Sequence, residues 1–283
     1  MTEPIFALED VSFAYPRHPA LAHISLRIQA GQRIALLGAN GSGKSTLLKL
    51  LDALYFPTQG TLKAFGDALS EERFADEAVN FAFRRRVGLV FQNPDIQIFN
   101  PTVFDEITFG PLQMGWPREE ILRRTDAILA RFGIAHLKDR APHRLSGGEK
   151  KRVALASVLI LEPEVLLLDE PTAALDPESQ GEVIRFLIES QGGGRTIITA
   201  THDLEIVADI ADYAFVLAGG KLVAEGTPAE ILANEALLRD THLAHAHWHR
   251  HADGALHAHV HAHRHDHAHA DGPSRYRAIK RNA

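Results

Sequence analysis

The chain has 283 residues, 45% of them hydrophobic, which is enough for one large or two small globular domains with a sizeable core. Its 30 Lys and Arg residues and 36 Asp and Glu residues give a formal charge of −6, so no nucleic acid partner and no general attraction to anionic lipid are expected. The absence of cysteine excludes disulfides and thiolate metal sites, fits a reducing compartment, and leaves any metal to His or carboxylate ligands.

No segment predicts a signal peptide or a membrane span. The N-terminal residues 1–4 lack the basic start and apolar run of a secretory signal. The longest apolar runs, such as residues 165–168, are far shorter than the about 20 residues of a membrane-crossing helix. If the protein acts in transport, another chain must therefore supply the membrane pore.

The N-terminal part of the chain changes from alternating to continuously apolar patterns. Residues 5–15 are rich in β-formers and residues 24–28 alternate, which predicts two antiparallel strands. Residues 33–37 form a short run typical of a buried strand, and the glycine-rich residues 38–43 and a helical pattern over 45–54 follow. Strand, glycine loop and helix is the order that a phosphate-binding loop needs.

Further strands and helices alternate along the rest of the chain. The predicted strands cover residues 87–91, 165–168, 196–200 and 213–217, and the predicted helices cover 147–161, 178–190 and 204–211. This alternation predicts an α/β fold with parallel strands and crossover helices. Residues 93–163 carry helical patterns but no convincing strand, so they predict a helical subdomain inserted into the α/β core.

The glycine loop matches the pattern G-x-x-x-x-G-K-[ST] between a predicted strand and a predicted helix, which is the context that gives this motif its meaning. Its glycines allow backbone N–H groups to turn toward phosphate oxygens, and the helix N-terminus adds positive potential. Lys44 is expected to reach the β- and γ-phosphates, and the Ser45 hydroxyl to bind Mg²⁺. The candidate nucleotide-binding residues are Gly38, Asn40, Gly41, Ser42, Gly43, Lys44, Ser45 and Thr46.

Two carboxylates end the apolar strand at residues 165–168. Ligands bind at the carboxyl edge of a parallel sheet, so Asp169 is expected to hold the metal. Glu170 is expected to orient or deprotonate the attacking water. The alternative is that two solvated acids merely end a strand. The lysine loop earlier in the chain makes this alternative much less favoured.

A second anion-binding helix start lies between these motifs. Residues 145–149 read Leu-Ser-Gly-Gly-Glu and open a predicted helix, where a hydroxyl, free N–H groups and the helix dipole converge. One nucleotide cannot easily use both ends of the same chain. The economical arrangement places Ser146, Gly147, Gly148 and Glu149 against a nucleotide held by a partner subunit.

With this motif the chain resembles the ABC ATPase family over about residues 5–232, because Leu-Ser-Gly-Gly is that family's signature. The resemblance implies a P-loop NTPase (RecA-like) core with an antiparallel β subdomain and an inserted helical subdomain. It assigns four further residues. Tyr15 matches the adenine-stacking aromatic, although it could instead be a core aromatic, and Gln92 matches the glutamine that contacts Mg²⁺ and water. Asp176 matches the loop at the dimer interface, and His202 the switch histidine near the γ-phosphate.

The mechanism that the resemblance implies is a dimer around two Mg-ATP molecules. Each ATP would lie between Lys44 of one chain and the Ser146 motif of the other, with Glu170, His202 and Gln92 as catalytic residues. Mg²⁺ would be held by Ser45, Gln92 and Asp169. The partner ATPase could be a second copy or a paralogue, which leaves a homodimer and a heterodimer open.

Residues 91–99 and 102–111 are similar to the energy-coupling-factor branch of the family, which serves uptake of vitamins and of cobalt or nickel. The resemblance implies a transmembrane coupling subunit, docked at this stretch, and a substrate-binding membrane subunit. The protein would then work at the cytoplasmic face of the cell membrane. Alternatively, the apolar residues of this stretch only pack the subdomain interface; these are Ile96, Ile98, Phe99 and Phe104.

A histidine-rich tail at residues 241–283 follows the predicted ATPase domain of residues 1–240. Twelve of the 17 histidines lie between His242 and His269, and no packed core is expected there. Neutral imidazole binds Ni²⁺ and Co²⁺ well, so a metal buffer is predicted; a solubilising tail is the alternative. The candidate ligands are His257, His259, His261, His263, His265, His267 and His269.

The core and the tail together favour nickel or cobalt uptake. Vitamin uptake through the same kind of module remains open, and the tail argues weakly against it. A non-transport ABC protein would usually carry two cassettes or long coiled-coil insertions, which are not visible here. A metal storage protein would leave the ATPase motifs without a role.

Overall fold

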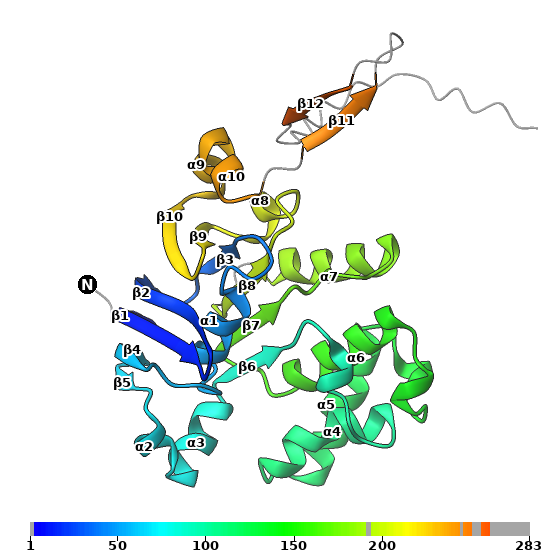
Figure 1. Cartoon of the computed structure of the whole chain (residues 1–283). Helices are drawn as coiled ribbons and strands as arrows, with labels where there is room; N and C mark the ends of the chain where they lie inside the picture. Colours follow the sequence, from blue (N-terminus) through cyan, green and yellow to red (C-terminus); the bar gives the residue numbers. More distant parts are fainter. Residues whose placement is uncertain (1–2, 191–193, 244–245, 251–255, 261–283) are drawn as a thin grey trace, which may run out of the picture.

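The structure is a computed structural model that describes residues 3–190 and 194–243, together with the backbone of 246–250 and 256–260. Two sheets and a group of helices make up its main part (Figure 1). The antiparallel sheet lies on one side of the molecule, and the helical subdomain with α4, α5 and α6 lies on the other (Figure 1).

The antiparallel sheet has the strand order β2-β1-β4-β5. Its strands are β1 (Phe6–Tyr15), β2 (His18–Ile28), β4 (Gln59–Ala64) and β5 (Asp67–Ala68). β1 pairs antiparallel with both β2 and β4, so the first two strands predicted from the sequence are confirmed. Tyr15 is the last residue of β1, and its hydroxyl contacts Thr46, shortly after the glycine loop.

The central sheet has the order β10-β9-β3-β8-β7-β6, and all its neighbours are parallel except β10, which is antiparallel to β9. Its strands are β3 (Arg33–Leu37), β6 (Val87–Val90), β7 (Val165–Asp169), β8 (Thr196–Thr201), β9 (Tyr213–Ala218) and β10 (Lys221–Gly226). The five parallel strands are those predicted from apolar runs. Their carboxyl ends meet at one edge.

Both faces of the central sheet are covered, which explains why its strands are continuously apolar. Leu166 and Leu168 of β7 face one hydrophobic cluster, which includes α6, α7 and α8. Val165 and Leu167 face the other cluster, which includes α1 and the antiparallel sheet. Successive side chains of a strand point to opposite faces of the sheet, so each strand contributes side chains to both clusters.

The helices lie around the two sheets. They are α1 (Lys44–Leu51), α2 (Glu71–Phe74), α3 (Glu77–Arg84), α4 (Val103–Gln113), α5 (Arg118–Arg131), α6 (Gly147–Leu159), α7 (Pro177–Glu189), α8 (Val207–Ile210), α9 (Pro228–Ala233) and α10 (Glu235–Asp240). Three short 3₁₀ turns are η1 (Pro94–Ile96), η2 (Ala135–Leu137) and η3 (Pro142–Arg144). Residues 93–163, all of them described, contain helices and no strand.

Two helices are shorter than the sequence predicts. The helix predicted over 45–54 ends at Leu51, and Ala53 has a left-handed φ of 50° that a helix cannot continue. The helix predicted over 204–211 is reduced to Val207–Ile210. Asp203 Oδ1 accepts the N–H of Glu205 and holds a turn there instead.

Helix α10 and the residues directly after it contribute to the core. Leu238 and Leu243 are buried in the cluster that includes α6. Two strands, β11 (Ala246–Arg250) and β12 (Leu256–Val260), then pair antiparallel. The candidate ligands His261, His263, His265, His267 and His269 lie outside the described residues. In the part of the chain that the structure covers, no helix is long and apolar enough to cross a membrane.

Candidate functional site

The glycine loop connects β3 to α1 and takes conformations that other residues disfavour. Gly43 has a φ of 108°, and a Cβ there would lie 2.7 Å from Leu21 Cδ2. A Cβ on Gly38 would lie 2.4 Å from the Leu217 carbonyl oxygen. Within the described residues no side chain caps the N-terminus of α1, so its first N–H groups are available to a phosphate. The loop therefore fits the cradle that its sequence predicts.

Lys44 is the first residue of α1, directly after this loop, and is almost fully buried. Its Nζ donates to the Gly38 carbonyl at 2.6 Å and to the Ala39 carbonyl at 3.3 Å. Glu170 Oε1 lies 3.3 Å from the same ammonium. The loop lysine and the second strand-end carboxylate, 126 positions apart in sequence, thus meet in one site.

Ser45 joins the loop to the other carboxylate. Its Oγ donates to Asp169 Oδ1 at 3.0 Å. Burial raises the pKa of Asp169, and the bond from Ser45 partly opposes this rise. A hydroxyl and a buried carboxylate side by side match the one or two protein ligands that Mg²⁺ takes when phosphates and water complete its shell.

Glu170 follows β7 in a left-handed conformation with a φ of 44°, and its N–H donates to the Ala200 carbonyl at 2.9 Å. Its Oε1 lies 2.9 Å from His202 Nδ1. The predicted base and the predicted switch histidine are therefore in direct contact. His202 is placed by β8, the strand next to β7 in the sheet.

Gln92 follows β6 and is exposed. Val90 pairs with Leu168 in the register of β6 and β7, so Gln92 and Glu170 each stand two residues beyond paired positions. This register brings Gln92 to the sheet edge that carries Asp169 and Glu170.

Tyr15 lies beside the loop helix. Its hydroxyl is 3.3 Å from Thr46 Oγ1, and its ring meets Phe13 and Tyr55 edge-on. The side chain is half-buried. It is thus both part of an aromatic cluster and next to the nucleotide-binding loop, so the two readings of this tyrosine are compatible.

Ser146 is the N-cap of α6 and forms a capping box with Glu149. Ser146 Oγ accepts the N–H of Glu149 at 3.3 Å, and Glu149 Oε2 accepts the N–H of Ser146 at 2.7 Å. The bond from the Ser146 backbone lowers the pKa of Glu149. Glu149 therefore stabilises the start of α6. The sequence predicted only that Glu149 lies against a partner's nucleotide, and not this capping role.

Gly148 brings α6 close to α7. A Cβ on Gly148 would lie 2.1 Å from Ser179 Oγ, so only glycine fits without displacement. Ser179 Oγ donates to Asp176 Oδ2 at 2.8 Å, and Asp176 Oδ1 accepts the N–H of Ser179. The signature glycine and the predicted interface residue Asp176 are therefore packed together within one chain.

The two predicted phosphate-binding helix starts belong to opposite faces of the central sheet. Leu47 and Leu48 of α1 lie in the cluster shared with the antiparallel sheet, whereas Val153 and Leu155 of α6 lie in the other cluster. This separation supports the expectation that one nucleotide does not use both ends of one chain.

Lys151, a buried charge beside the site, is not among the residues predicted from the sequence. The Lys151 ammonium donates to the carbonyls of Phe91 at 2.9 Å and Gln92 at 3.2 Å. Burial lowers its pKa to about 8, against the opposing effect of the nearby Asp169 and Glu170 carboxylates. The signal was available, because Lys151 shares a helix face with the buried Leu155 four residues later.

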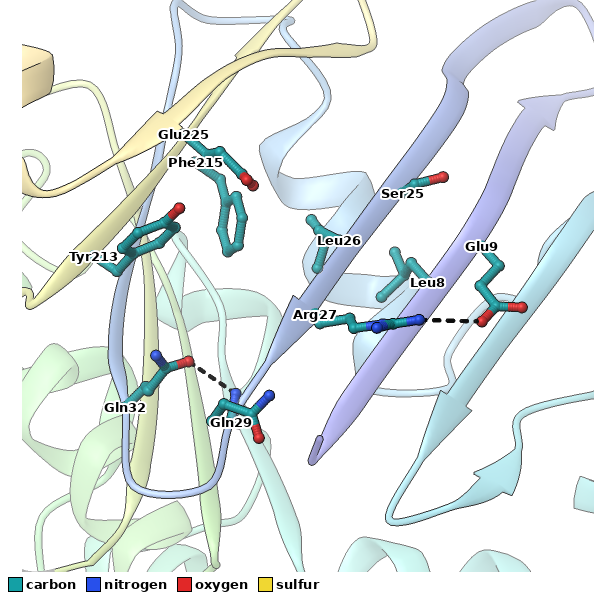
Figure 2. Close-up of a pocket in the computed structure, with 10 residues that line it drawn as sticks. All are labelled: Leu8, Glu9, Ser25, Leu26, Arg27, Gln29, Gln32, Tyr213, Phe215 and Glu225. Atoms are coloured by element: carbon teal, nitrogen blue, oxygen red, sulfur yellow. Dashed lines mark hydrogen bonds and ion pairs between the residues drawn. The ribbon is translucent and has the colours of Figure 1, made fainter. Parts of the chain in front are cut away.

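A cavity of about 440 Å³ lies elsewhere, between the antiparallel sheet and β9–β10 (Figure 2). Arg27 and Glu9 form an ion pair on one side, and the N–H of Gln29 donates to Gln32 Oε1 on the other (Figure 2). None of the predicted site residues lines it. Across the described ranges, no group of three or more His, Asp or Glu side chains could hold a metal ion.

Comparison with known proteins places this site in a family. Residues 21–173 match the ABC transporter family, and the chain belongs to it. The chain is 59% identical over 244 residues to the nickel import ATP-binding protein NikO of Rhodobacter capsulatus, a match that covers 85% of this chain and 96% of that protein. It is 43% identical over 237 residues to the energy-coupling factor transporter ATP-binding protein EcfA of Methanothermobacter thermautotrophicus, covering 83% and 75%.

Solved structures agree with this assignment. CbiO1 of Clostridium perfringens, described as part of the ABC transporter complex cbiONQ, is 39% identical, with a TM-score of 0.72 over 86% of this chain and 96% of that one. The ATP-binding cassette MJ0796, solved as a dimer with ADP and Pi, is 26% identical with a TM-score of 0.71, covering 79% and 98%. The predicted P-loop α/β fold and the ABC ATPase class are confirmed. The roles of single residues remain predictions.

Proposed function

We propose that the chain is the ATP-hydrolysing subunit of an importer for nickel or cobalt. The observation that carries this proposal is the joined set of Lys44, Ser45, Asp169, Glu170 and His202 in a chain that is 59% identical to a nickel import ATP-binding protein. The cbiO1 structure, part of cbiONQ, and EcfA support the energy-coupling-factor branch.

Each residue of the set has a role in the proposed hydrolysis. The N–H groups of the loop bind phosphate oxygens, and Lys44 exchanges the Gly38 carbonyl for the β- and γ-phosphates. Ser45 and Asp169 would hold Mg²⁺ together with Gln92. When bound, Mg²⁺ neutralises charge on the phosphates. Glu170 accepts a proton from the attacking water, and His202 fixes the Glu170 carboxylate.

A second chain completes the site in this proposal. Tyr15 stacks on adenine, and Ser146, Gly147 and Gly148 of the partner cover the γ-phosphate from the other side. The placement of α1 and α6 on opposite faces of the sheet supports this head-to-tail arrangement. Binding of two ATP molecules closes the dimer, and hydrolysis reopens it. The partner is a second copy of the chain or a paralogue.

An exposed apolar surface on the helical subdomain supports a membrane partner. It consists of Ile96, Phe99, Phe109 and Leu112, of which Ile96 and Phe99 are each 68% exposed. The Phe99 and Phe109 rings meet edge-to-face at 5.0 Å. Buried Glu106 holds the segment, because its Oε2 accepts the N–H groups of Phe99 and Asn100.

Both readings of this stretch therefore receive support from the geometry. Ile98 packs against the core, as the packing alternative expected, but Ile96 and Phe99 point outward. Large apolar side chains at such exposure are typical of protein contacts. We assign the occupant as a cytoplasmic helix of the transmembrane coupling subunit, which together with a substrate-binding membrane subunit holds the ATPase at the cytoplasmic face of the membrane.

The histidine tail would supply a metal buffer. Seven candidate ligands at alternate positions, His257 to His269, offer repeated imidazole pairs along the sequence. The tail would raise the local concentration of Ni²⁺ or Co²⁺ without a fixed coordination geometry.

The proposal is tested by uptake of labelled nickel, cobalt and a panel of vitamins into cells that carry the wild-type chain or Lys44→Ala. Loss of nickel or cobalt uptake, with vitamin uptake unchanged, is expected. Lys63→Ala, at an exposed position of β4, is the control and should retain uptake. Metal uptake that survives Lys44→Ala would contradict the metal assignment, and loss of vitamin uptake would replace it with the vitamin alternative.

A further inference from the structure

Lys151 is unusual among the charged residues that the structure describes because it is only 1% exposed. Burying an ammonium is unfavourable unless hydrogen bonds and opposite charges compensate it. Here the compensation comes from the carbonyls of Phe91 and Gln92, at 2.9 Å and 3.2 Å from Nζ. Lys151 therefore forms a hydrogen bond with the backbone of Gln92, the residue that is predicted to contact Mg²⁺ and water.

The same segment is held a second time by Gln97. The N–H of Phe91 donates to Gln97 Oε1 at 3.1 Å, and Gln97 Nε2 donates to the Ala154 carbonyl at 3.0 Å. Ala154 and Lys151 both belong to α6. The donor and the acceptor of the Phe91 backbone are thus both connected to one helix, which leaves the Gln92 backbone little freedom relative to α6.

Helix α6 carries the signature motif at its start and contacts the predicted interface loop. Gly148 approaches Ser179, which is bonded to Asp176, and Arg152 pairs with Glu182 of α7 at 2.9 Å. The first turns of α6 therefore connect two predicted parts of the nucleotide site and one predicted dimer-interface residue. These are the Ser146 motif, Gln92 and Asp176.

We propose that Lys151 is a positioning residue for ATP hydrolysis, which holds the Gln92 backbone so that Gln92 and the signature helix move together as one unit. The inference rests on the role of Gln92 given under the proposed function. In this role Lys151 acts through the Gln92 backbone, which its ammonium contacts, and not by contacting nucleotide or metal. A long side chain with several donors is needed, because it reaches two consecutive carbonyls from the neighbouring helix.

Lys151→Met tests the inference, since Met keeps the length and apolar stem of the side chain but donates no hydrogen bond. For the purified full chain, kcat for ATP should fall by about tenfold to 100-fold, because a small displacement of a site residue has effects of this size. The KM for ATP should change by less than about twofold, because the phosphate-binding loop is untouched. Lys138→Met removes an exposed lysine of the helical subdomain that pairs with Asp126, and should leave both constants unchanged.

A double-mutant cycle with Gln92→Ala separates positioning from a general effect on the fold. If Lys151 acts through Gln92, adding Lys151→Met to Gln92→Ala should lower kcat by less than about twofold. The inference would be overturned if the losses of kcat in the two single variants multiply in the double variant, or if Lys151→Met has a normal kcat. Should Lys151→Met fail to fold, Gln97→Met takes its place in the same cycle with the same expected non-additivity. A wild-type chain without ATPase activity would instead overturn the proposed function.

Discussion

At Glu170 a single carboxylate oxygen has two neighbours, the Lys44 ammonium at 3.3 Å and His202 Nδ1 at 2.9 Å. ATP phosphates would compete with Glu170 for Lys44, because they carry more negative charge than one carboxylate. After this exchange, His202 alone would orient Glu170. The carboxylate would then be free to accept a proton from water while the histidine fixes its position.

Glu170→Gln is expected to abolish turnover and trap an ATP-bound dimer. The amide can still bond to His202, so the site should stay ordered, but it cannot accept the proton of the attacking water. Loss of a general base of this kind lowers rates by about 10²- to 10⁴-fold. Size-exclusion chromatography with Mg-ATP checks for the dimer, and phosphate release checks the rate. Glu119→Gln, on α5, serves as the control, and normal turnover in Glu170→Gln would remove Glu170 from its role.

Residues whose position is set by a local motif could be predicted, and those whose position is set by packing could not. Lys44, Ser45, Asp169 and the signature glycines follow from strand, loop and helix patterns. The capping box with Ser146 is also a local motif and accounts for Glu149, whereas the prediction placed Glu149 at a partner's nucleotide. The helix face that Lys151 shares with Leu155 indicates burial, but its carbonyl partners depend on the approach of α6 to the end of β6, which only the folded chain shows.

Among the elements, the loop helix α1 is held at its C-terminal end by α3. Arg84 Nη1 donates to Asp52 Oδ2 at 2.9 Å, and Arg84 Nη2 donates to the Ala53 carbonyl at 3.2 Å. These bonds satisfy groups that follow the last turn of α1. Burial raises the pKa of Asp52 from its ordinary 3.8 to about 7, although Arg84 acts in the opposite direction.

This pKa predicts a pH-dependent stability. Between about pH 4 and pH 7 the folded state holds a proton on Asp52 that the unfolded state has released, so the free energy of unfolding falls as pH rises. Asp52→Asn keeps an acceptor for Arg84 but cannot titrate. Its stability relative to wild type should therefore increase from about pH 4.5 to about pH 7.5, as measured by urea unfolding. A constant difference between the two proteins would mean that Asp52 is ionised in the fold.

The central sheet was predictable and the region between α1 and β6 was not. Strands such as β3 and β7 are continuously buried, and their apolar runs are distinctive. β4 has four exposed residues among six, β5 has two residues, and α2 has four, which are too short or too polar for a periodic signal. β4 exists because β1 offers an edge to pair with, and this is a tertiary effect.

At the scale of the whole molecule, ATP hydrolysis and metal buffering are expected to occur in separable parts. Among the residues whose side chains the structure describes, Leu243 is the last one buried against the cluster that includes α6. Every candidate site residue other than the tail histidines precedes it. A truncation after Leu243 should therefore leave the fold and the nucleotide site complete.

The chain that ends at Leu243 is expected to keep its thermal stability within a few degrees and its ATPase rate within about twofold of the full chain, because it retains every core residue that the structure describes. Nickel binding in isothermal titration should decrease, since all seven candidate ligands from His257 to His269 are removed.

Metal uptake should weaken when nickel is scarce and stay normal when nickel is plentiful, as a buffer stores metal without driving transport. A truncated chain that binds nickel as well as the full chain would assign the tail a solubilising role, and an equal loss of uptake at all nickel concentrations would make it part of the transport step.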